Sequence, residues 1–563
     1  MMKIQMQLIK VWLAGVALLA AAGVGHGATY YLNAALGSDD NSGTSPEAPF
    51  RTLARADKLT LNAGDQVLLA AGQKFAGQLA YENLTGTAAQ PIVISSYPAN
   101  LETGNDQAAI DARGFVAGVC LKNCAQIKVA NLLISADAGG MQPGQMVKTN
   151  LRCGVLVVAD EPGDFAGFTL TNLTVKDIFY EAPGFVRSSE EVKSANGTQN
   201  YGWGIRFLSS AAGTVLRDIH IADCQIENVS HTGLKLTAPD SGLQNVSVQR
   251  VKITGTGGPG VQMSGVSGGR FSELDVNRSG SKDDGRKWGR GSGLWTWGSS
   301  DVIIEKSRFQ NANGPGDSAG VHIDFNCRNV IVQYNWSAHN AGGFCEILGN
   351  NHNCAYRYNV SVNDGYRVKG RDGAFQEGKT FWLSGYVGDK NPKQGPFNTY
   401  FYNNTVYVAS NIVAKISVAP TASGVLIANN IFYIMGRSES VAGDQSKADK
   451  FLSAPLRNVV FKNNLFLHPD NWPADSGLRD QSPINGDPGF QKAGGMSLED
   501  YVPTNGGLVR HRGIPIPLIP GDATGLVGGL KIEWDILGHP IVGNPDLGAI
   551  EMIERNNSKL GSR

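Results

Sequence analysis

Five side chains in three successive segments have types and spacing that could perform chemistry on a sugar. The segments read GLWTWGSSDVIIEKSRFQNAN from Gly293, GVHIDFNCRNVIVQYNWSAHN from Gly320 and GFCEILGNNHNCAYRYNVSVND from Gly343. Each begins with a short alternating stretch, in which every second side chain faces the same side of a strand. The outward positions are then Trp295, Trp297, His322, Asp324 and Glu346. The register of the third segment is chosen so that Glu346 is not buried without a partner, which would be costly.

These residue types suit two catalytic reactions. For β-elimination, His322 could remove the proton beside a uronate carboxylate while Arg367, Lys369 or Arg371 neutralises that carboxylate. For hydrolysis with inversion, Asp324 and Glu346 would act as a pair, one coil and two residues apart. Steps of ~4.8 Å and ~6.6 Å place their attachment points about 8 Å apart, within the range of inverting glycosidases.

The two tryptophans suggest that sugar rings bind on this face. Outward aromatic rings offer a large amphipathic surface, and they are unfavourable in water unless a ligand or a loop covers them. Glu346 beside His322 should favour the charged imidazole and orient it. The sequence therefore predicts an exposed sugar platform next to a His–carboxylate pair. A glycan-binding or adhesion protein without catalysis is a third interpretation.

The elements that carry these residues repeat along the chain. The segment starts lie 27 and 23 residues apart (320−293 and 343−320), and earlier starts at Gly204, Gly233 and Gly260 continue the series. A repeat of this length with two-residue alternation and no helical period predicts consecutive coils of a parallel β-helix. Extending the alternation back along the coils adds Arg206, Lys235 and Gln262 to the outward column of Trp295, His322 and Glu346.

Two loops and a series of asparagines accompany the coils. The loops, residues 279–291 and 364–379, are net positive, so they could concentrate positive charge beside a groove. Lys287 and Arg290, with Arg206 and Lys235, are therefore candidate substrate-binding residues. Recurrent corner asparagines should form a ladder of amide hydrogen bonds from coil to coil. They are Asn335, Asn359, Asn404, Asn430 and Asn464.

The start of the chain carries a more specific signal. The stretch TYYLNAALGSDDNSGTSPEAPFRTLARADKL combines a strand, an acidic Asx/Gly loop, a Pro-Phe-x-Thr-Leu segment and a short helix. It resembles the entry of secreted right-handed parallel β-helix proteins of the pectate-lyase-like superfamily. The resemblance implies an all-β solenoid whose first coil is capped by the helix, and it favours the lyase interpretation. The Asp39–Asp40–Asn41 cluster could bind calcium or form an ordinary Asx turn.

Composition bounds the remaining possibilities. Lys and Arg balance Asp and Glu at 49 each among 563 residues, so no charge argument favours nucleic acid. Residues 1–28 have the basic start, apolar run and small residues of a signal peptide, which predicts a secreted or periplasmic protein with no membrane segment after cleavage. The seven cysteines lack metal-site spacing and fit buried positions, although Cys120 with Cys124, or Cys327 with Cys345 or Cys354, could pair.

The expected organisation is one solenoid domain in a monomer. We expect a cap with the first coils over residues 29–112, the β-helix over 113–470 and a covering tail over 471–563. The expected function is cleavage of an acidic, uronate-containing polysaccharide by a lyase, with an inverting hydrolase or a non-catalytic binder as alternatives. No cofactor is required by this chemistry, and calcium is the one metal that the acidic loop suggests.

Overall fold

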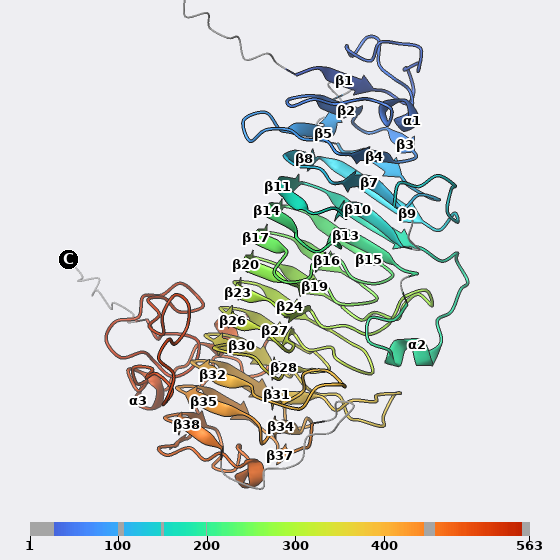
Figure 1. Ribbon diagram of the computed structural model, residues 1–563. Helices are drawn as coiled ribbons and strands as arrows, with labels where there is room; N and C mark the ends of the chain where they lie inside the picture. Colours follow the sequence, from blue (N-terminus) through green and yellow to red (C-terminus); the bar gives the residue numbers. More distant parts are fainter. Residues whose placement is uncertain (1–26, 99–105, 148–150, 199, 444–455, 554–563) are drawn as a thin grey trace, which may run out of the picture.

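The protein is a parallel β-helix, a stack of coils that each contribute one strand to three long sheets (Figure 1). The computed structural model describes residues 27–98, 106–147, 151–198, 200–443 and 456–553. Every named strand pairs in parallel with the equivalent strand of the next coil, and Leu294, Val321 and their neighbours pair in the predicted register. The predicted all-β solenoid is confirmed. The predicted signal peptide lies almost entirely outside the described residues.

Three sheets form the walls of the solenoid. The first sheet contains β1 (Thr29–Leu32), β2 (Gln66–Ala70), β5 (Ile92–Tyr97), β8 (Ile127–Ala130), β11 (Gly163–Thr171), β14 (Thr214–Ala222), β17 (Leu243–Gln249), β20 (Val266–Ser272), β23 (Ser300–Glu305), β26 (Arg328–Gln333), β29 (Ala355–Arg357), β32 (Phe397–Tyr402), β35 (Ser423–Ala428) and β38 (Arg457–Lys462). The second sheet contains β3 (Lys74–Ala76), β6 (Ala108–Asp111), β9 (Leu132–Asp137), β12 (Thr174–Phe179), β15 (Gln225–Val229), β18 (Lys252–Thr254), β21 (Asp275–Asn277), β24 (Arg308–Gln310), β27 (Trp336–Ala338), β30 (Val360–Val362), β33 (Thr405–Val408), β36 (Ile431–Ile434), β39 (Leu465–Phe466) and β40 (Ile484–Asn485). The third sheet, called the site sheet below, contains β4 (Leu79–Glu82), β7 (Ala117–Lys122), β10 (Arg152–Ala159), β13 (Gly202–Ser209), β16 (Leu234–Thr237), β19 (Val261–Ser264), β22 (Leu294–Trp297), β25 (Val321–Ile323), β28 (Gly343–Ile347), β31 (Lys379–Leu383), β34 (Ala414–Val418) and β37 (Ser438–Ser440).

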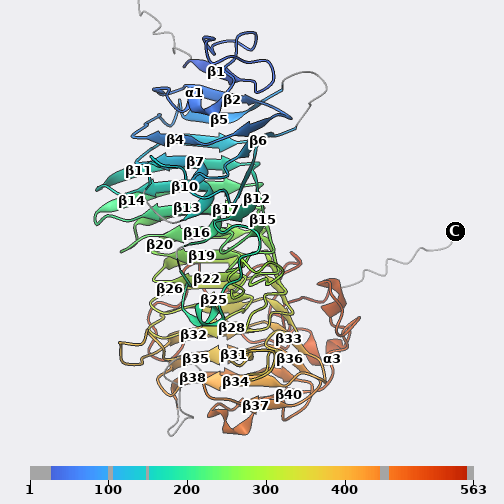
Figure 2. The ribbon, with the colours of Figure 1, turned by 90° about the vertical axis from the view of Figure 1, so that its right-hand side faces the viewer.

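Alternation along the strands builds one continuous apolar core inside the coils. In the site sheet Val261, Leu294, Val321 and Ile323 point inward and are almost fully buried. The next residue of each strand points outward, as the two-residue period requires. Figure 2 looks onto this outward side of the site sheet, where β16, β19, β22 and β25 follow one another down the stack.

The first coil is closed by a short helix, as predicted. Helix α1 (Leu53–Ala56) buries Leu53 and Ala56 against the start of the core. Thr52 caps this helix, and the Asp39 carboxylate accepts hydrogen bonds from the backbone N–H groups of Arg51 and Thr52 and from the Thr52 hydroxyl. Asp39 therefore holds the helix entry. Calcium binding at this loop stays a prediction.

The predicted asparagine ladder is present at the corner between the first and second sheets. Asn335, Asn359, Asn404, Asn430 and Asn464 are buried, and each side-chain amide donates to a neighbouring ladder carbonyl or carboxylate at 2.7–3.1 Å. Each amide also donates to a backbone carbonyl of an adjacent coil. The ladder satisfies polar groups that the sharp corner would otherwise leave without partners.

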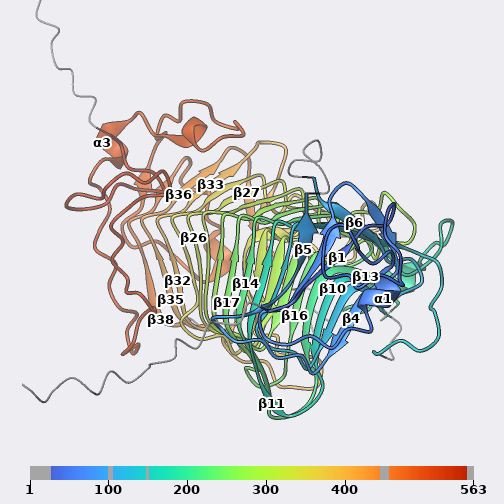
Figure 3. The same ribbon diagram turned by 90° about the horizontal axis from the view of Figure 1, so that it is seen from above.

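The C-terminal tail runs back along the outside of the solenoid. Figure 3, seen along the stack, shows the tail with α3 (Gly506–Val509) outside the first and second sheets. Asp522 accepts hydrogen bonds from Tyr400 and Asn353, and Asn403 donates to the backbone of Asp546. These contacts are distant in sequence, so the tail covers the outer faces of both sheets, as the sequence predicts.

All seven cysteines are free and buried. The disulfides that the sequence allowed are not formed. Among the described residues, no helix is long and apolar enough to cross a membrane.

Candidate active site

The predicted outward column exists on the site sheet. Strand pairing aligns Arg206 with Lys235, Lys235 with Gln262, Gln262 with Trp295, and Trp295 with His322. The pairing of Ile323 with Ile347 places Glu346 beside His322 on the next coil. The sequence therefore predicts the neighbours of this column correctly.

The predicted exposure of the column is wrong. Trp295 is 7 % exposed and His322 is 2 % exposed, while Trp297, two residues further along β22, is half-buried. Strand alternation indicates which side chains face outward but not what covers them, and long loops return over this face. Instead of an open platform, Trp295 is an internal wall: its ring stacks on the His322 ring with centroids 5.6 Å apart, and its Nε1 donates to Asp324 Oδ2 at 2.9 Å.

The loop that carries helix α2 (Ser189–Lys193) is one of these covers, and we call residues 187–198 the α2 loop. Its sequence lies between β12 and β13, but α2 sits far down the stack, at the level of later coils (Figures 1 and 2). Arg290 holds it there by donating to the carbonyls of Val192 and Lys193. Asn196 of this loop accepts a hydrogen bond from Gln262 Nε2 at 2.8 Å.

A cavity of about 290 Å³ remains between these covers and the site sheet. Trp295, Trp297, Phe325, Leu348 and Tyr386 supply its apolar wall. Its polar lining is formed by Asn196, Arg290, Asp317, His322 and Asp324. Apolar surface with a few convergent polar groups is the usual make-up of a small-ligand site, so we call this space the catalytic cavity.

Asp324 enters the cavity from the end of β25. Its backbone N–H donates to Thr296 O at 2.8 Å, and its Oδ1 accepts from the N–H of Phe325 at 2.9 Å. Burial raises the pKa of Asp324 to about 7, outweighing the hydrogen bonds from Phe325 and Trp295 that lower it. Asp324 therefore carries a proton at neutral pH in a substantial fraction of molecules.

Asp317 is the acidic residue of the cavity that the strand alternation does not indicate. It lies in the turn between β24 and β25, and Arg290 binds both of its carboxylate oxygens, with Nε 2.7 Å from Oδ2 and Nη2 3.2 Å from Oδ1. Although burial opposes ionisation, this pairing holds the pKa of Asp317 below its ordinary value. One feature of the sequence could have indicated Asp317: it lies seven residues before Asp324, in the turn that leads into the strand of His322.

Loop residues fix the backbone of Asp317. Gln376 Oε1 accepts from its N–H at 2.6 Å, and the guanidinium of Arg367 donates to its carbonyl at 2.8 Å. Arg367 also donates to the carbonyls of Gln376 and Gly314. Its guanidinium is thus engaged by the backbone and does not face the cavity as a uronate neutraliser.

Lys369, Arg371 and Lys287 also lie outside the cavity lining, whereas Arg290 belongs to it. Lys369 and Arg371 are exposed on their loop, and Arg371 lines a different hollow. Lys287 is buried with its Nζ 2.7 Å from both Asp283 Oδ1 and Gly255 O. The structure does not bring these three residues to His322.

His322 and Glu346 lie together as predicted, but their pKa values shift in the directions opposite to those predicted. His322 Nε2 is 3.4 Å from Glu346 Oε1, without the angle of a hydrogen bond. Burial lowers the pKa of His322 to about 4 and, with repulsion from Asp317, raises that of Glu346 well above its ordinary value. Removal from water outweighs their mutual attraction, so both pKa shifts favour the neutral form of the group.

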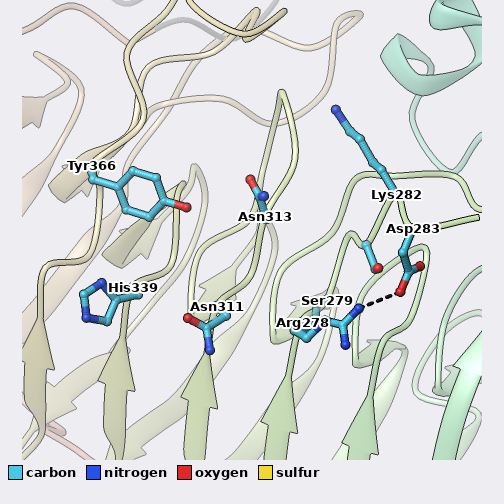
Figure 4. Close-up of a pocket in the computed structure, with 9 residues that line it drawn as sticks. Arg278, Ser279, Lys282, Asp283, Asn311, Asn313, His339 and Tyr366 are labelled. Atoms are coloured by element: carbon cyan, nitrogen blue, oxygen red, sulfur yellow. Dashed lines mark hydrogen bonds and ion pairs between the residues drawn. The ribbon is translucent and has the colours of Figure 1, made fainter. Parts of the chain in front are cut away.

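A larger hollow of about 510 Å³ lies at the turns beyond the second sheet (Figure 4). Its lining includes Lys282, Asn313, His339 and Tyr366, with the Tyr366 hydroxyl directed toward Asn313. Asp283 is its single carboxylate, and it is ion-paired with Arg278 and Lys287. This hollow lacks a second acid, so the catalytic cavity is the better candidate for acid–base chemistry. No grouping of three or more potential metal ligands occurs in the described part of the chain.

Comparison with known proteins agrees with the topology. The family model for the right-handed β-helix region matches residues 203–406. This chain folds as a right-handed parallel β-helix. A lacto-N-biosidase from Bifidobacterium longum subsp. longum is 24 % identical in an alignment that takes in 93 % of this chain and 36 % of that protein. The chain thus spans just over a third of the length of this curated relative.

Solved β-helix structures are also similar. The GH136 lacto-N-biosidase from Eubacterium ramulus is 19 % identical with a TM-score of 0.49, over 77 % of this chain and 68 % of that one. The pectate lyase Pel9A is 13 % identical with a TM-score of 0.38, over 94 % and 98 % of the two chains.

Proposed function

We propose that this protein is a glycan-cleaving enzyme, and specifically a glycoside hydrolase that uses Asp324 as general acid and Asp317 as its anionic partner. The observation that carries the proposal is the pair of carboxyl groups that line one cavity with pKa values displaced in opposite directions. A hydrolase needs one carboxyl protonated and the other ionised at the same pH. The curated relative, named as a lacto-N-biosidase, supports hydrolysis.

In this proposal Asp324 donates its proton to the glycosidic oxygen as the bond from that oxygen to the anomeric carbon breaks. Asp317 then either attacks the anomeric carbon or removes a proton from the water that does so. The hydrogen bond from Trp295 Nε1 stabilises the Asp324 carboxylate left behind. The aromatic wall of Trp295, Trp297 and Tyr386 packs against the sugar ring.

The proposal is tested with a panel of oligosaccharides, including ones that end in lacto-N-biose, and with aryl glycosides of the same sugars. Wild-type protein should release reducing ends. Asp324→Asn should lose activity most on natural glycosides and retain it on aryl glycosides, whose leaving groups need no protonation. Asp317→Asn should lose activity on both. Proton NMR of the anomer formed first identifies whether Asp317 attacks directly.

Asp240→Asn is the matched control, because Asp240 is an exposed aspartate in the turn after β16. It should leave the rates unchanged. Equal activity of wild type, Asp317→Asn and Asp324→Asn on every glycan that is cleaved would refute the assigned roles. Binding without product from any glycan would favour the adhesion alternative.

β-Elimination is the second candidate, and one observation favours it. Burial and the neighbouring Arg206 lower the pKa of Lys235 to about 7, a value suited to a general base. Incubation with uronate polysaccharides distinguishes the reactions, because a lyase forms an unsaturated product with strong ultraviolet absorbance. A hydrolase forms reducing ends without it.

A further inference from the structure

Two cations on the site sheet are buried together without an acidic partner. Arg206 of β13 and Lys235 of β16 are register neighbours and are 6 % and 5 % exposed. Within the described residues, neither forms an ion pair with a carboxylate. Paired charges are the rule for buried Arg and Lys, so this arrangement requires a physical reason.

The surroundings of the two cations do not neutralise them. Arg206 Cζ lies 4.6 Å and Lys235 Nζ 5.7 Å from the centroid of the Trp203 ring. The ring face offers some attraction, but the two like charges repel each other in a site from which water is largely excluded. Burial lowers the pKa of both groups, and repulsion from Arg206 lowers the pKa of Lys235 further.

Several hydrogen-bond donors beside the cations are also unpaired. In the described structure Arg206 Nε and Nη1 have no hydrogen-bond partner, and neither has Thr237 Oγ1 or Trp203 Nε1. Thr237 follows Lys235 by two residues, so both side chains leave the same face of β16. Buried donors are ordinarily satisfied. Here, donors and positive charge converge without an acceptor.

This cluster belongs to the same column as the catalytic cavity. Gln262 and Trp295 are the two positions between Lys235 and His322. Asn196 lines the cavity and contacts Gln262, so the α2 loop covers the column at the boundary between the two places. A glycan chain that extends along the column from the cavity would replace the Asn196–Gln262 contact and reach Lys235.

We propose that Arg206 and Lys235, with Thr237, form a subsite that binds an anionic oxygen group of the glycan, a carboxylate or a sulfate ester. The forked donors of Arg206 match the planar or tetrahedral oxygens of such a group. The subsite lies away from Asp317 and Asp324, so it selects the substrate and does not take part in bond cleavage. Substrate recognition in this form rests on the proposed function, whereas anion binding itself does not.

Binding is measured on the full chain by thermal unfolding and calorimetry with sodium glucuronate and sodium sulfate as probes. Glucose and sodium chloride at matched ionic strength serve as reference solutes. We expect at least one of the two anions to raise Tm and to bind, and the preferred one identifies carboxylate or sulfate as the source. Arg206→Met and Lys235→Met should each weaken binding at least tenfold.

Lys128→Met is the matched control, since Lys128 is exposed on the first sheet and should not change binding. No binding of either anion by the wild type, or equal binding by the wild type and both column variants, overturns the proposal. A second readout needs no ligand. Removing an unpaired buried charge should raise Tm in Lys235→Met, whereas a lower Tm would indicate that the cation serves the fold and would contradict the subsite.

The Asp324→Asn variant separates this proposal from the proposed function. It should bind the anion like the wild type while it loses hydrolysis. Anion binding without hydrolysis of any glycan by the wild type would reject the hydrolase and keep the subsite. Hydrolysis by a wild-type protein that binds neither anion would keep the hydrolase and reject the subsite.

Discussion

At the scale of residues, the candidate site is controlled by removal from water. Asp324, His322 and Glu346 are all buried, and burial is the largest influence on the pKa of each. Burial also acts to raise the pKa of Asp317, but the Arg290 guanidinium contacts both of its oxygens and holds that pKa below its ordinary value. One cavity therefore contains a carboxyl group that retains its proton beside a carboxylate that does not.

The first prediction concerns the pH dependence that follows from Asp324. Because its pKa is raised to about 7, the acid form is present below pH 7 and is lost above it. The kcat/KM should therefore fall above about pH 7, by roughly tenfold per pH unit. A pH–rate profile on a natural glycoside measures this limb. Asp324→Asn should remove the limb, and a profile that keeps it in the variant would assign the acid elsewhere.

The second prediction concerns the ion pair of Arg290 and Asp317. Arg290→Met should raise the pKa of Asp317 by roughly 1–3 units, because a neighbouring guanidinium lowers a carboxyl pKa by that amount. The acidic limb of the kcat/KM profile should move to higher pH accordingly. Arg278→Met is the control, since Arg278 pairs with Asp283 at the other hollow. An unmoved acidic limb in Arg290→Met would contradict the ionised role of Asp317.

At the scale of elements, strands and loops contribute different information. The strands and their register follow from two-residue alternation and from the corner asparagines, so the sequence predicts that Trp295, His322 and Glu346 are neighbours. The α2 loop has no such period, and nothing in its sequence shows that it reaches Gln262 of β19, two strands beyond β13 in the site sheet. The burial of Trp295, the selection of Asp317 and the lowered pKa of His322 all depend on these covers. They could not be predicted from strand patterns.

The third prediction belongs to the corner ladder. Asn359 donates to Asn404 Oδ1 and Val332 O and accepts from Asn335. Asn359→Leu should lower the free energy of unfolding by about 1–3 kcal/mol, because these buried groups lose partners. Denaturant unfolding measures the loss, and activity per folded molecule should be retained. Gln249→Leu, at a half-buried position of β17 on the first sheet, is the control. Equal stability of the two variants would exclude a structural role for the ladder.

At the scale of the whole molecule, the tail covers apolar side chains on the outer faces of the first and second sheets. Tyr400 and Tyr402 of the first sheet pack with Ile519 and Leu526 of the tail. Trp336 and Tyr407 of the second sheet pack with Tyr501 and Leu547. On the third sheet the tail contacts β37, through Asn471 and Asp475, while the α2 loop covers the column at Gln262.

The fourth prediction tests the attachment of the tail. Asp522 accepts from Tyr400 Oη at 2.6 Å and from Asn353 Nδ2 at 2.8 Å, and these bonds help to hold its pKa at about 2. Asp522→Ala should destabilise the protein by about 2–4 kcal/mol through the lost bonds of a charged acceptor. Limited proteolysis should then cut within residues 506–553 more rapidly. Asp470→Ala, at an exposed position after β39, is the control. An unchanged rate of proteolysis would contradict the prediction and show that other contacts hold the tail on the solenoid.

The regular spacing of the coils also fixes the distance between the two ends of the outward column on the site sheet. Three coil steps separate Lys235 from His322, and four separate Arg206 from it. At ~4.8 Å per step, the charged end lies about 14–19 Å from the reacting end. Gain or loss of one coil between them would change this distance by a fixed increment and leave both ends intact. The length of substrate that such a protein accepts can thus change through the number of coils, while the residues of the cavity and of the cationic subsite stay the same.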